Sequence, residues 1–214
     1  MDAVRDWVTW HGAYDDPASG LAARLQRVRE HLRLAIDHAP PGPVRLVSLC
    51  AGQGRDVLGV LPGHPRRREV TALLVEADPG NASRARRGAA AAGLTQLEVR
   101  EADASRPAAF ADAWPADVLL LCGIFGNVSD DDIRRTVAAA PAMCAAGATV
   151  IWTRHRRAPD LTPSIRAWFG AGGFAEVAFD ALETGTLSGV GVNRLRRAPG
   201  ARLPAGPLFT FRDS

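Results

Sequence analysis

The sequence predicts an α/β fold with a doubly wound, mostly parallel sheet of seven strands and an antiparallel strand in a C-terminal hairpin. Three observations support this prediction. Strand and helix patterns alternate from residue 44 to residue 170, as they do in sheets with crossover helices. The run at 117–122 is nearly all apolar, which is typical of a strand covered on both faces. The last two strand patterns have no helical pattern between them, which indicates a hairpin.

An amphipathic helix is predicted over 20–38, ahead of the first strand. Apolar residues recur there with the helical period, at Leu21, Leu25, Val28, Leu32, Ala35 and Ile36. Ser19 is the expected N-cap, and the proline- and glycine-rich run at 40–43 ends the helix. We therefore expect residues 1–40 to form a helical extension and residues 41–214 the main domain, in one compact unit of ordinary domain length.

The remaining elements are predicted from apolar runs and helical patterns bounded by glycine, proline and acidic residues. The expected strands are 44–50, 70–75, 97–99, 117–122, 148–153, 174–179 and 187–195. The expected helices are 55–61, 80–92, 130–143 and 162–170. Ser129 is placed to cap the third of these helices, and Pro163 stands in the first turn of the fourth.

The composition is that of an ordinary globular protein, with 214 residues, 47% hydrophobic and 23% charged. All 26 Lys and Arg residues are arginine, yet the net charge is only +3. Coding bias explains a chain without lysine better than nucleic-acid binding does, and the arginine clusters fall on separate elements. This disfavours a nucleic-acid partner without excluding one.

The cellular location is also constrained by composition. No run of about 18 apolar residues exists, and the N-terminus lacks the pattern of a signal peptide. The three cysteines show no metal-ligand spacing, so we expect free thiols, no metal site and no membrane. These features predict a cytoplasmic protein. The oligomeric state is left open.

Three features are predicted to meet at one edge of the sheet. A glycine turn at Gly52 and Gly54 follows the first strand, Glu76 ends the second, and Asp103 follows the third. Ligands of open α/β sheets bind at the carboxyl ends of the strands, where a carboxylate such as Glu76 can accept the ribose hydroxyls of a nucleoside. For Asp103, a surface turn is almost as good an explanation as a ligand contact. Val57 and the final hairpin argue against a nicotinamide dinucleotide.

The chain resembles the class I methyltransferases that use S-adenosylmethionine, which have a Rossmann-like fold. The resemblance covers about residues 44–196 and rests on the runs 47–56, 75–78, 102–104 and 119–126. It implies that the first motif holds the methionine part, Glu76 the ribose and Asp103 the adenine, with the fourth strand ending beside the sulfonium. The implied cofactor-binding residues are Cys50, Ala51, Gly52, Gly54, Arg55, Asp56, Glu76, Ala77, Asp103, Ala104, Cys122 and Gly123. Cys50 departs from the acid that the family often has there.

Candidates for the acceptor side lie after the fourth and fifth strands and near the N-terminus. His155 is a candidate general base, and Arg154 and Arg156 are candidate anion clamps, with a solvated basic loop as the alternative. Phe125 and Asn127 are candidates for the acceptor pocket. The aromatic N-terminus can form a lid that brings His11 and Tyr14, two further candidate catalytic residues, over the site, or a hydrophobic anchor through Trp7 and Trp10.

The function that the resemblance implies is methyl transfer from S-adenosylmethionine to an oxygen or nitrogen of a small molecule, which can be anionic. The Asp/Asn-Pro-Pro-Tyr/Phe pattern of adenine- and glutamine-methylating relatives is absent, since residues 122–125 read Cys-Gly-Ile-Phe. Three alternatives stay open: an RNA methyltransferase, a noncatalytic nucleoside-binding module and, less favoured, a nicotinamide-dependent reductase.

Overall fold

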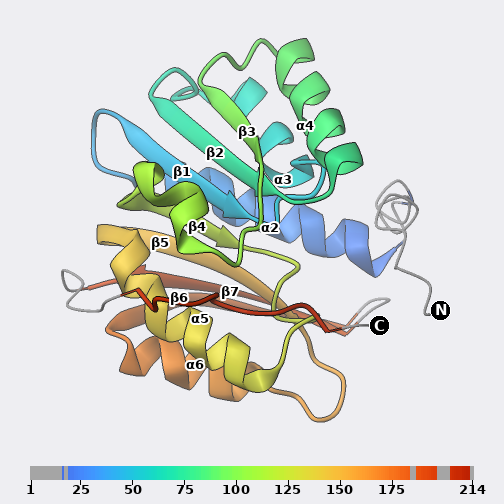
Figure 1. Cartoon of the computed structure of the whole chain (residues 1–214), viewed down its shortest axis with the longest axis vertical. Helices are drawn as coiled ribbons and strands as arrows, with labels where there is room; N and C mark the ends of the chain where they lie inside the picture. The colour runs from blue at the N-terminus through green and yellow to red at the C-terminus, as the bar shows by residue number, and fades with distance from the viewer. Residues whose placement is uncertain (1–15, 17–18, 184–186, 197–202, 213–214) are drawn as a thin grey trace.

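A seven-stranded sheet in the order β3-β2-β1-β4-β5-β7-β6 lies at the centre of the computed structural model (Figure 1), which describes residues 16, 19–183, 187–196 and 203–212. The strands are β1 (Val44–Leu49), β2 (Val70–Glu76), β3 (Leu97–Glu101), β4 (Ala116–Leu121), β5 (Cys144–His155), β6 (Phe174–Leu182) and β7 (Ser188–Leu195). Strands β1 to β5 pair in parallel, and β7 runs antiparallel to both β5 and β6. The predicted sheet and C-terminal hairpin are confirmed.

Helices cover both faces of the sheet. They are α2 (Gly20–Asp37), α3 (Arg55–Leu58), α4 (Pro79–Ala91), α5 (Asp130–Met143) and α6 (Thr162–Ala171), with 3-10 helices at Leu61–Gly63 and Pro107–Ala113. Buried residues of α2, α3 and α4 share one apolar core with one face of the sheet. Buried residues of α5 and α6 share a second core with the other face. This is the doubly wound arrangement that alternation predicts.

Burial on both faces explains the apolar runs in the central strands. In β4, Val118 and Leu120 point into the core shared with α2, while Leu119 and Leu121 point into the core shared with α5. All four are 0% exposed. A strand of this kind has no polar face, so its sequence shows no period-two alternation.

Helix α2 belongs to the same core as the sheet. Its Val28, Leu32 and Ile36 are buried against β-strand residues, and the Ser19 side chain accepts a hydrogen bond from the Ala22 amide at 3.0 Å, which confirms the predicted cap. The division of the chain at residue 40 stays a prediction.

No helix in the described ranges is long and apolar enough to span a membrane.

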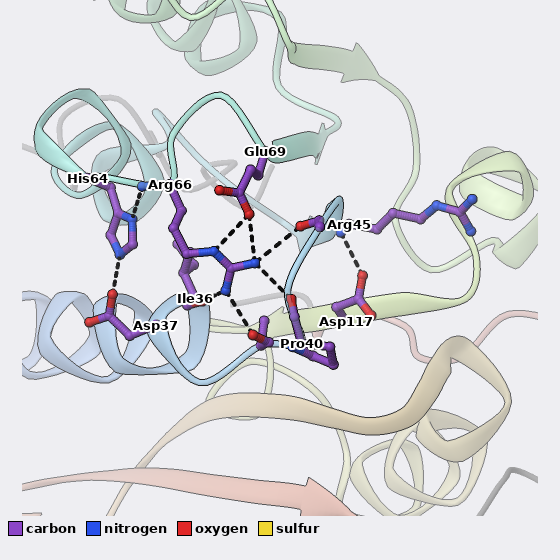
Figure 2. A network of polar contacts seen from close by, with 10 residues as sticks. Ile36, Asp37, Pro40, Arg45, His64, Arg66, Glu69 and Asp117 are labelled. Carbon is purple, nitrogen blue, oxygen red and sulfur yellow. Dashed lines mark hydrogen bonds and ion pairs between the residues drawn. The ribbon is translucent and has the colours of Figure 1, made fainter.

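A polar network secures the C-terminus of α2 at the amino edge of the sheet (Figure 2). The Arg66 guanidinium donates to the carbonyl oxygens of Ile36, Ala39, Pro40 and Gly42, at 2.6 to 3.1 Å, and to Glu69. Beside it, the buried His64 accepts the Arg66 amide through Nδ1 and places Nε2 3.3 Å from the Asp37 carboxylate. One side chain thus joins the last turn of α2 and the segment that follows it to the loop before β2.

Some element boundaries differ from the sequence predictions. Strand β5 begins at Cys144, directly after α5, rather than at residue 148, and the helix predicted at 55–61 is divided into α3 and a 3-10 helix. The 3-10 helix at Pro107–Ala113 was not predicted, because a seven-residue segment shows too little periodicity. Near the C-terminus, Leu208 and Phe209 are buried, and Phe211 pairs with Val128. This segment therefore packs against the loop after β4.

Candidate active site

The carboxyl ends of the parallel strands bring the predicted site residues to one edge of the sheet. Strands β1 and β2 end at Leu49 and Glu76, which are adjacent in register to Val75 and Glu101 of the neighbouring strands. The loop after β4 and the end of β5 lie at the same edge, because these strands also pair in parallel. The residues implied by the resemblance therefore lie on four adjacent strand ends.

The turn after β1 has a left-handed backbone at three positions, two of which are glycine. Cys50, Gly52 and Gly54 all have positive φ angles, of 54°, 57° and 67°. A Cβ atom on Gly54 would lie 2.6 Å from the Leu74 side chain, which real structures do not allow. The turn closes with the Gly54 amide donating to the Ala51 carbonyl at 2.9 Å.

Glu76 connects this turn to the second strand. Its carboxylate accepts the Gly52 amide through one oxygen, at 2.7 Å, and the Asp78 amide through the other, at 2.9 Å. A carboxylate offers about four lone-pair sites, so each oxygen retains acceptor capacity for a ligand. The sequence prediction that the turn and Glu76 meet is confirmed by these contacts.

Asp103 lies close to both features. Its carboxylate accepts the Ser105 amide at 2.9 Å and lies 3.4 Å from the Arg106 side chain, while the neighbouring Ala104 is buried. Burial raises the pKa of the Cys50 thiol well above its usual range, and the charges of Glu76 and Asp103 raise it further. Cys50 therefore stays a neutral thiol between two carboxylates rather than a nucleophile.

Two of the implied residues, Asp56 and Arg55, interact with the turn itself and with helix α2. Asp56 is buried, and burial raises its pKa although hydrogen bonds from backbone amides and the Arg29 charge oppose the shift. The Arg55 side chain donates to Gln53, at 3.2 Å, and the Arg55 carbonyl accepts two hydrogen bonds from Arg29 of α2. These two residues stabilise the turn, and the contribution of Arg29 was not apparent from the sequence, since it is 26 positions away.

The loop after β4 is held by polar contacts to neighbouring strands. The Gly123 amide donates to the Thr153 hydroxyl at 3.0 Å, and the Asn127 side chain donates to the Gly123 carbonyl at 2.7 Å. Gly123 has a φ of 81°, and an added Cβ would meet nothing within 4 Å. Phe125 is fully buried, with its ring 6.1 Å from that of Trp152, so its side chain belongs to the core rather than to the free surface of the loop.

Cys122, the last residue before Gly123, also remains a neutral thiol. Burial raises its pKa, the Asp56 charge raises it further, and Arg24 of α2 opposes the shift. Both Arg24 and Asp56 therefore lie near enough to the end of β4 to influence Cys122. The N-terminal part of α2, which carries Arg24, thus approaches the carboxyl edge of the sheet. Arg27, one turn later, instead pairs with Glu30 and Asp180.

The three basic residues at the end of β5 differ in their surroundings. Arg154 is buried, its Nη1 donates to the Phe125 carbonyl, and its Nε has no hydrogen-bond partner in the described part of the chain. Arg156 pairs with Glu183 at 2.6 Å and with Asp160 at 3.5 Å. Burial lowers the pKa of His155, and the charges of Arg154 and Arg157 lower it further. His155 is therefore neutral at neutral pH, as a general base must be.

Some predicted site residues are not placed. His11 and Tyr14, together with Trp7 and Trp10, lie outside the described residues, so the lid and the anchor both stay predictions. In the ranges that the structure covers, no group of three or more His, Cys, Asp and Glu side chains is arranged to hold a metal ion. Ser129 caps α5, with its hydroxyl accepting the Asp132 amide at 3.1 Å, as predicted.

Comparisons by sequence find no matching family model and no matching curated protein. Solved structures, by contrast, are similar. The magnesium protoporphyrin IX methyltransferase of Synechocystis PCC 6803, solved with bound S-adenosylmethionine, matches with a TM-score of 0.70 and 10% identity, over 90% of this chain and 92% of that one. An RNA methyltransferase from Salinibacter ruber, in complex with S-adenosylhomocysteine, matches with a TM-score of 0.56 and 20% identity, over 85% of this chain and 96% of that one.

An O-methyltransferase family protein from Burkholderia thailandensis also matches, with a TM-score of 0.64 and 16% identity. The match covers 85% of this chain but only 58% of that protein. Identities this low show the shared architecture and leave the acceptor undetermined. With the strand order and the glycine turn already described, these comparisons show that the chain has the fold of the class I S-adenosylmethionine-dependent methyltransferases.

Proposed function

We propose that the chain is a methyltransferase that uses S-adenosylmethionine and methylates an oxygen or nitrogen of a small molecule. The observation that carries this proposal is the contact between Glu76 and the Gly52 amide, at 2.7 Å, which joins the glycine turn to the acid at the end of β2. The structural similarity to methyltransferases solved with S-adenosylmethionine or S-adenosylhomocysteine supports the same cofactor.

The residues at this edge fit such a cofactor. Glu76 has acceptor sites left for the two ribose hydroxyls after binding the Gly52 and Asp78 amides. Asp103 is more than half exposed, so one of its oxygens is accessible to an adenine amino group. Gly52 carries no side chain, so a ligand can approach the backbone of the turn at this position. Cys50 to Gly54 would then hold the methionine part.

Bound S-adenosylmethionine supplies a methyl group on a positively charged sulfur, and the chain has to position the acceptor. Methyl transfer of this type depends mainly on alignment of the two reactants. The loop held by Gly123 and Asn127 lies beside the end of β5, where neutral His155 is available to accept a proton from an acceptor hydroxyl or amine. The three cysteines are free thiols, which suits the cytoplasm as the location of this reaction.

Calorimetric titration with S-adenosylhomocysteine, and with nicotinamide dinucleotides for comparison, tests the cofactor. We expect binding of the former and none of the latter. A wild-type protein that fails to bind S-adenosylhomocysteine would contradict the proposal. Incubation with S-adenosylmethionine and a metabolite panel then separates an enzyme, which releases S-adenosylhomocysteine, from a noncatalytic binding module.

A matched pair of variants tests the role of Glu76. Glu76→Gln removes the charged acceptor that we assign to the ribose hydroxyls, and we expect S-adenosylhomocysteine affinity to fall by about 1.5–3 kcal/mol, the usual contribution of a hydrogen bond to a charged group. Glu101→Gln is the control, because Glu101 is adjacent in register but exposed, 3.5 Å from Arg86. Equal affinities of the two folded variants would remove the ribose assignment.

A further inference from the structure

Arg154 is a buried cation that forms no ion pair with a carboxylate among the described residues. Only 6% of the residue is exposed, and its Nε is buried without a hydrogen-bond partner among the described residues. Its Nη1 donates to the Phe125 carbonyl, which is neutral. Arginine keeps its charge in proteins, and an isolated buried charge is costly unless something compensates it. The cost indicates that a negative group belongs at this position.

The two acidic residues whose charges act on Arg154, Asp160 and Asp130, have other partners. Asp160 accepts hydrogen bonds from the amide and hydroxyl of Thr162, at 2.9 and 2.7 Å, and faces Arg156. Asp130 lies 3.8 Å from the Arg212 side chain. Arg157 and Arg212 add positive charge around Arg154. The charges of Asp130 and Asp160 favour the Arg154 cation, but neither acid forms an ion pair with it in the described structure.

Two other arginines show what a neutralised guanidinium looks like in this protein. Arg156 donates to Glu183 at 2.6 Å, and Arg166 forms two hydrogen bonds with Glu176, at 2.6 and 2.7 Å. Both are more exposed than Arg154. The arginine that is buried most deeply of these three thus lacks the carboxylate partner that the other two have.

We propose that Arg154 binds a terminal anionic group of the methyl acceptor, a carboxylate or a phosphate. This inference rests on the proposed function, because the bound anion is taken to belong to the acceptor. The guanidinium fork matches the planar oxygens of such groups. His155 is the next residue, and its ring lies 3.8 Å from where a Cβ on Gly126 would be, so the anion and the candidate base share the loop after β4.

Burial of Arg154 favours a small molecule over RNA. A backbone phosphate is flanked by sugars on both sides, so it reaches exposed guanidinium groups more readily than enclosed ones. A terminal carboxylate or phosphate carries no such flanks and can enter a confined position. The structure therefore favours an acceptor with a free anionic end.

The test uses the full chain, saturated with S-adenosylhomocysteine, and two minimal probes, inorganic phosphate and benzoate. Binding is measured by calorimetry for the wild type and for Arg154→Met, Arg154→Lys and Arg194→Met. Arg194 is the matched control, since it is an exposed arginine on β7 that donates to the Gly147 carbonyl at the opposite edge of the sheet. Chemical unfolding of each variant checks that it folds.

We expect at least one probe to bind the wild type and Arg194→Met equally, and to bind Arg154→Met about tenfold or more weakly, because charge-assisted bidentate hydrogen bonds are lost. Arg154→Lys should bind at an intermediate level, since it keeps the charge without the fork. A preference for phosphate or for benzoate identifies which anion the site takes. Unfolding should show Arg154→Met at least as stable as the wild type, because an apolar residue replaces an uncompensated charge.

Several outcomes would overturn the inference. One is binding of neither probe, and another is equal weakening in Arg154→Met and Arg194→Met. Marked destabilisation of Arg154→Met, with anion binding unchanged in Arg154→Lys, would assign Arg154 to support of the Phe125 carbonyl. Tight binding of a single-stranded RNA that depends on Arg154 would favour a nucleic-acid substrate instead. Failure to bind S-adenosylhomocysteine contradicts the proposed function separately, since that titration needs no anion.

Discussion

Gly54 shows how a single backbone position determines the shape of the candidate site. Its φ angle is 67°, and a Cβ atom added to it would lie 2.6 Å from the Leu74 side chain. Both constraints act on the turn that carries the Gly52 amide to Glu76. The glycine is therefore required by conformation and by packing together.

We predict that Gly54→Ala lowers the free energy of unfolding by about 2–4 kcal/mol, through the left-handed backbone and the overpacked contact. S-adenosylhomocysteine affinity should fall with it, because the turn has to shift. Gly63→Ala is the control, since Gly63 has ordinary φ and nothing within 4 Å of an added Cβ. Urea unfolding measures both, and a similar small effect in the two variants would contradict the argument.

His155 makes stability depend on pH in a defined direction. Burial lowers its pKa from the ordinary value of 6.5, Arg154, Arg157 and Arg212 lower it further, and Asp160 opposes them. The unfolded chain therefore binds a proton at a higher pH than the folded chain does. Below about 6.5 the unfolded state takes up more protons, so the free energy of unfolding must fall as the pH falls.

We predict that His155→Gln removes part of this dependence. The difference in the free energy of unfolding between wild type and variant should be constant above neutral pH. It should change in favour of the variant as the pH falls below about 6.5 and through the lowered pKa. Urea titrations at a series of pH values measure it, and two parallel stability profiles would show that His155 does not carry the effect.

At the scale of residues, the sequence predicted where the site lies, but it did not predict how the individual residues of the site differ in burial and charge pairing. Gly52, Gly54 and Glu76 are recognisable because a glycine turn and an acid stand at strand ends, where topology alone brings them together. Arg154 and Arg156 look equivalent in the sequence. Only the structure distinguishes them. Arg156 pairs with Glu183, which directly follows β6 and is far away in the sequence.

At the scale of elements, the end of α2 depends on a residue from a distant loop. Arg66 donates to four carbonyls between Ile36 and Gly42 and to Glu69 (Figure 2). This network lies at the amino edge of the sheet, opposite the candidate site. Its role is therefore to hold the helix against the strands rather than to bind a ligand.

We predict that Arg66→Met lowers the free energy of unfolding by about 2–3 kcal/mol, since several hydrogen bonds from a charged donor are lost. S-adenosylhomocysteine affinity should stay within a factor of about two, on the usual additivity of distant sites. Arg67→Met is the control, because Arg67 makes one 3.2 Å bond to the Pro62 carbonyl at the surface. A large loss of affinity in folded Arg66→Met would contradict this separation of roles.

Elements with strong periodicity or continuous apolar runs were predictable, and short or tightly joined ones were not. Helix α2 and strands β1, β2 and β4 occur where the sequence indicates them. The start of β5 was not predicted, because residues 144–147 join α5 to the strand without a turn signal before them. Of these residues only Cys144 pairs with β4, opposite Ala116, and the register then shifts before Val118 pairs with Thr149.

At the scale of the whole molecule, the candidate site is inseparable from the sheet. Its residues follow β1, β2, β3 and β4, whose buried side chains fill the two apolar cores on either face. Helix α2 is tied to the far side of the same sheet, where His31 hydrogen-bonds with Asp180 of β6. Ligand binding should therefore be linked to unfolding of the entire described structure.

We predict a single cooperative thermal unfolding transition. S-adenosylhomocysteine should raise the midpoint temperature of the whole transition. A ligand at a hundred times its dissociation constant adds about 2.7 kcal/mol to the free energy of unfolding. Differential scanning calorimetry measures the shift, with nicotinamide adenine dinucleotide as the ligand control. Two separate transitions, with only one of them responding, would show that the site belongs to an independent unit.

The sequence by itself determined the order of the elements, the doubly wound sheet with its antiparallel hairpin strand, and the rim on which Glu76 and the glycine turn meet. These follow from local periodicity and from the rule that parallel strands end at one edge. The tertiary structure alone decided which charges are neutralised. Among the described residues Arg154 is left without a carboxylate, Arg156 is paired, and His155 is held neutral. Burial and charge depend on groups brought together from β5, α5, the hairpin and the C-terminal segment.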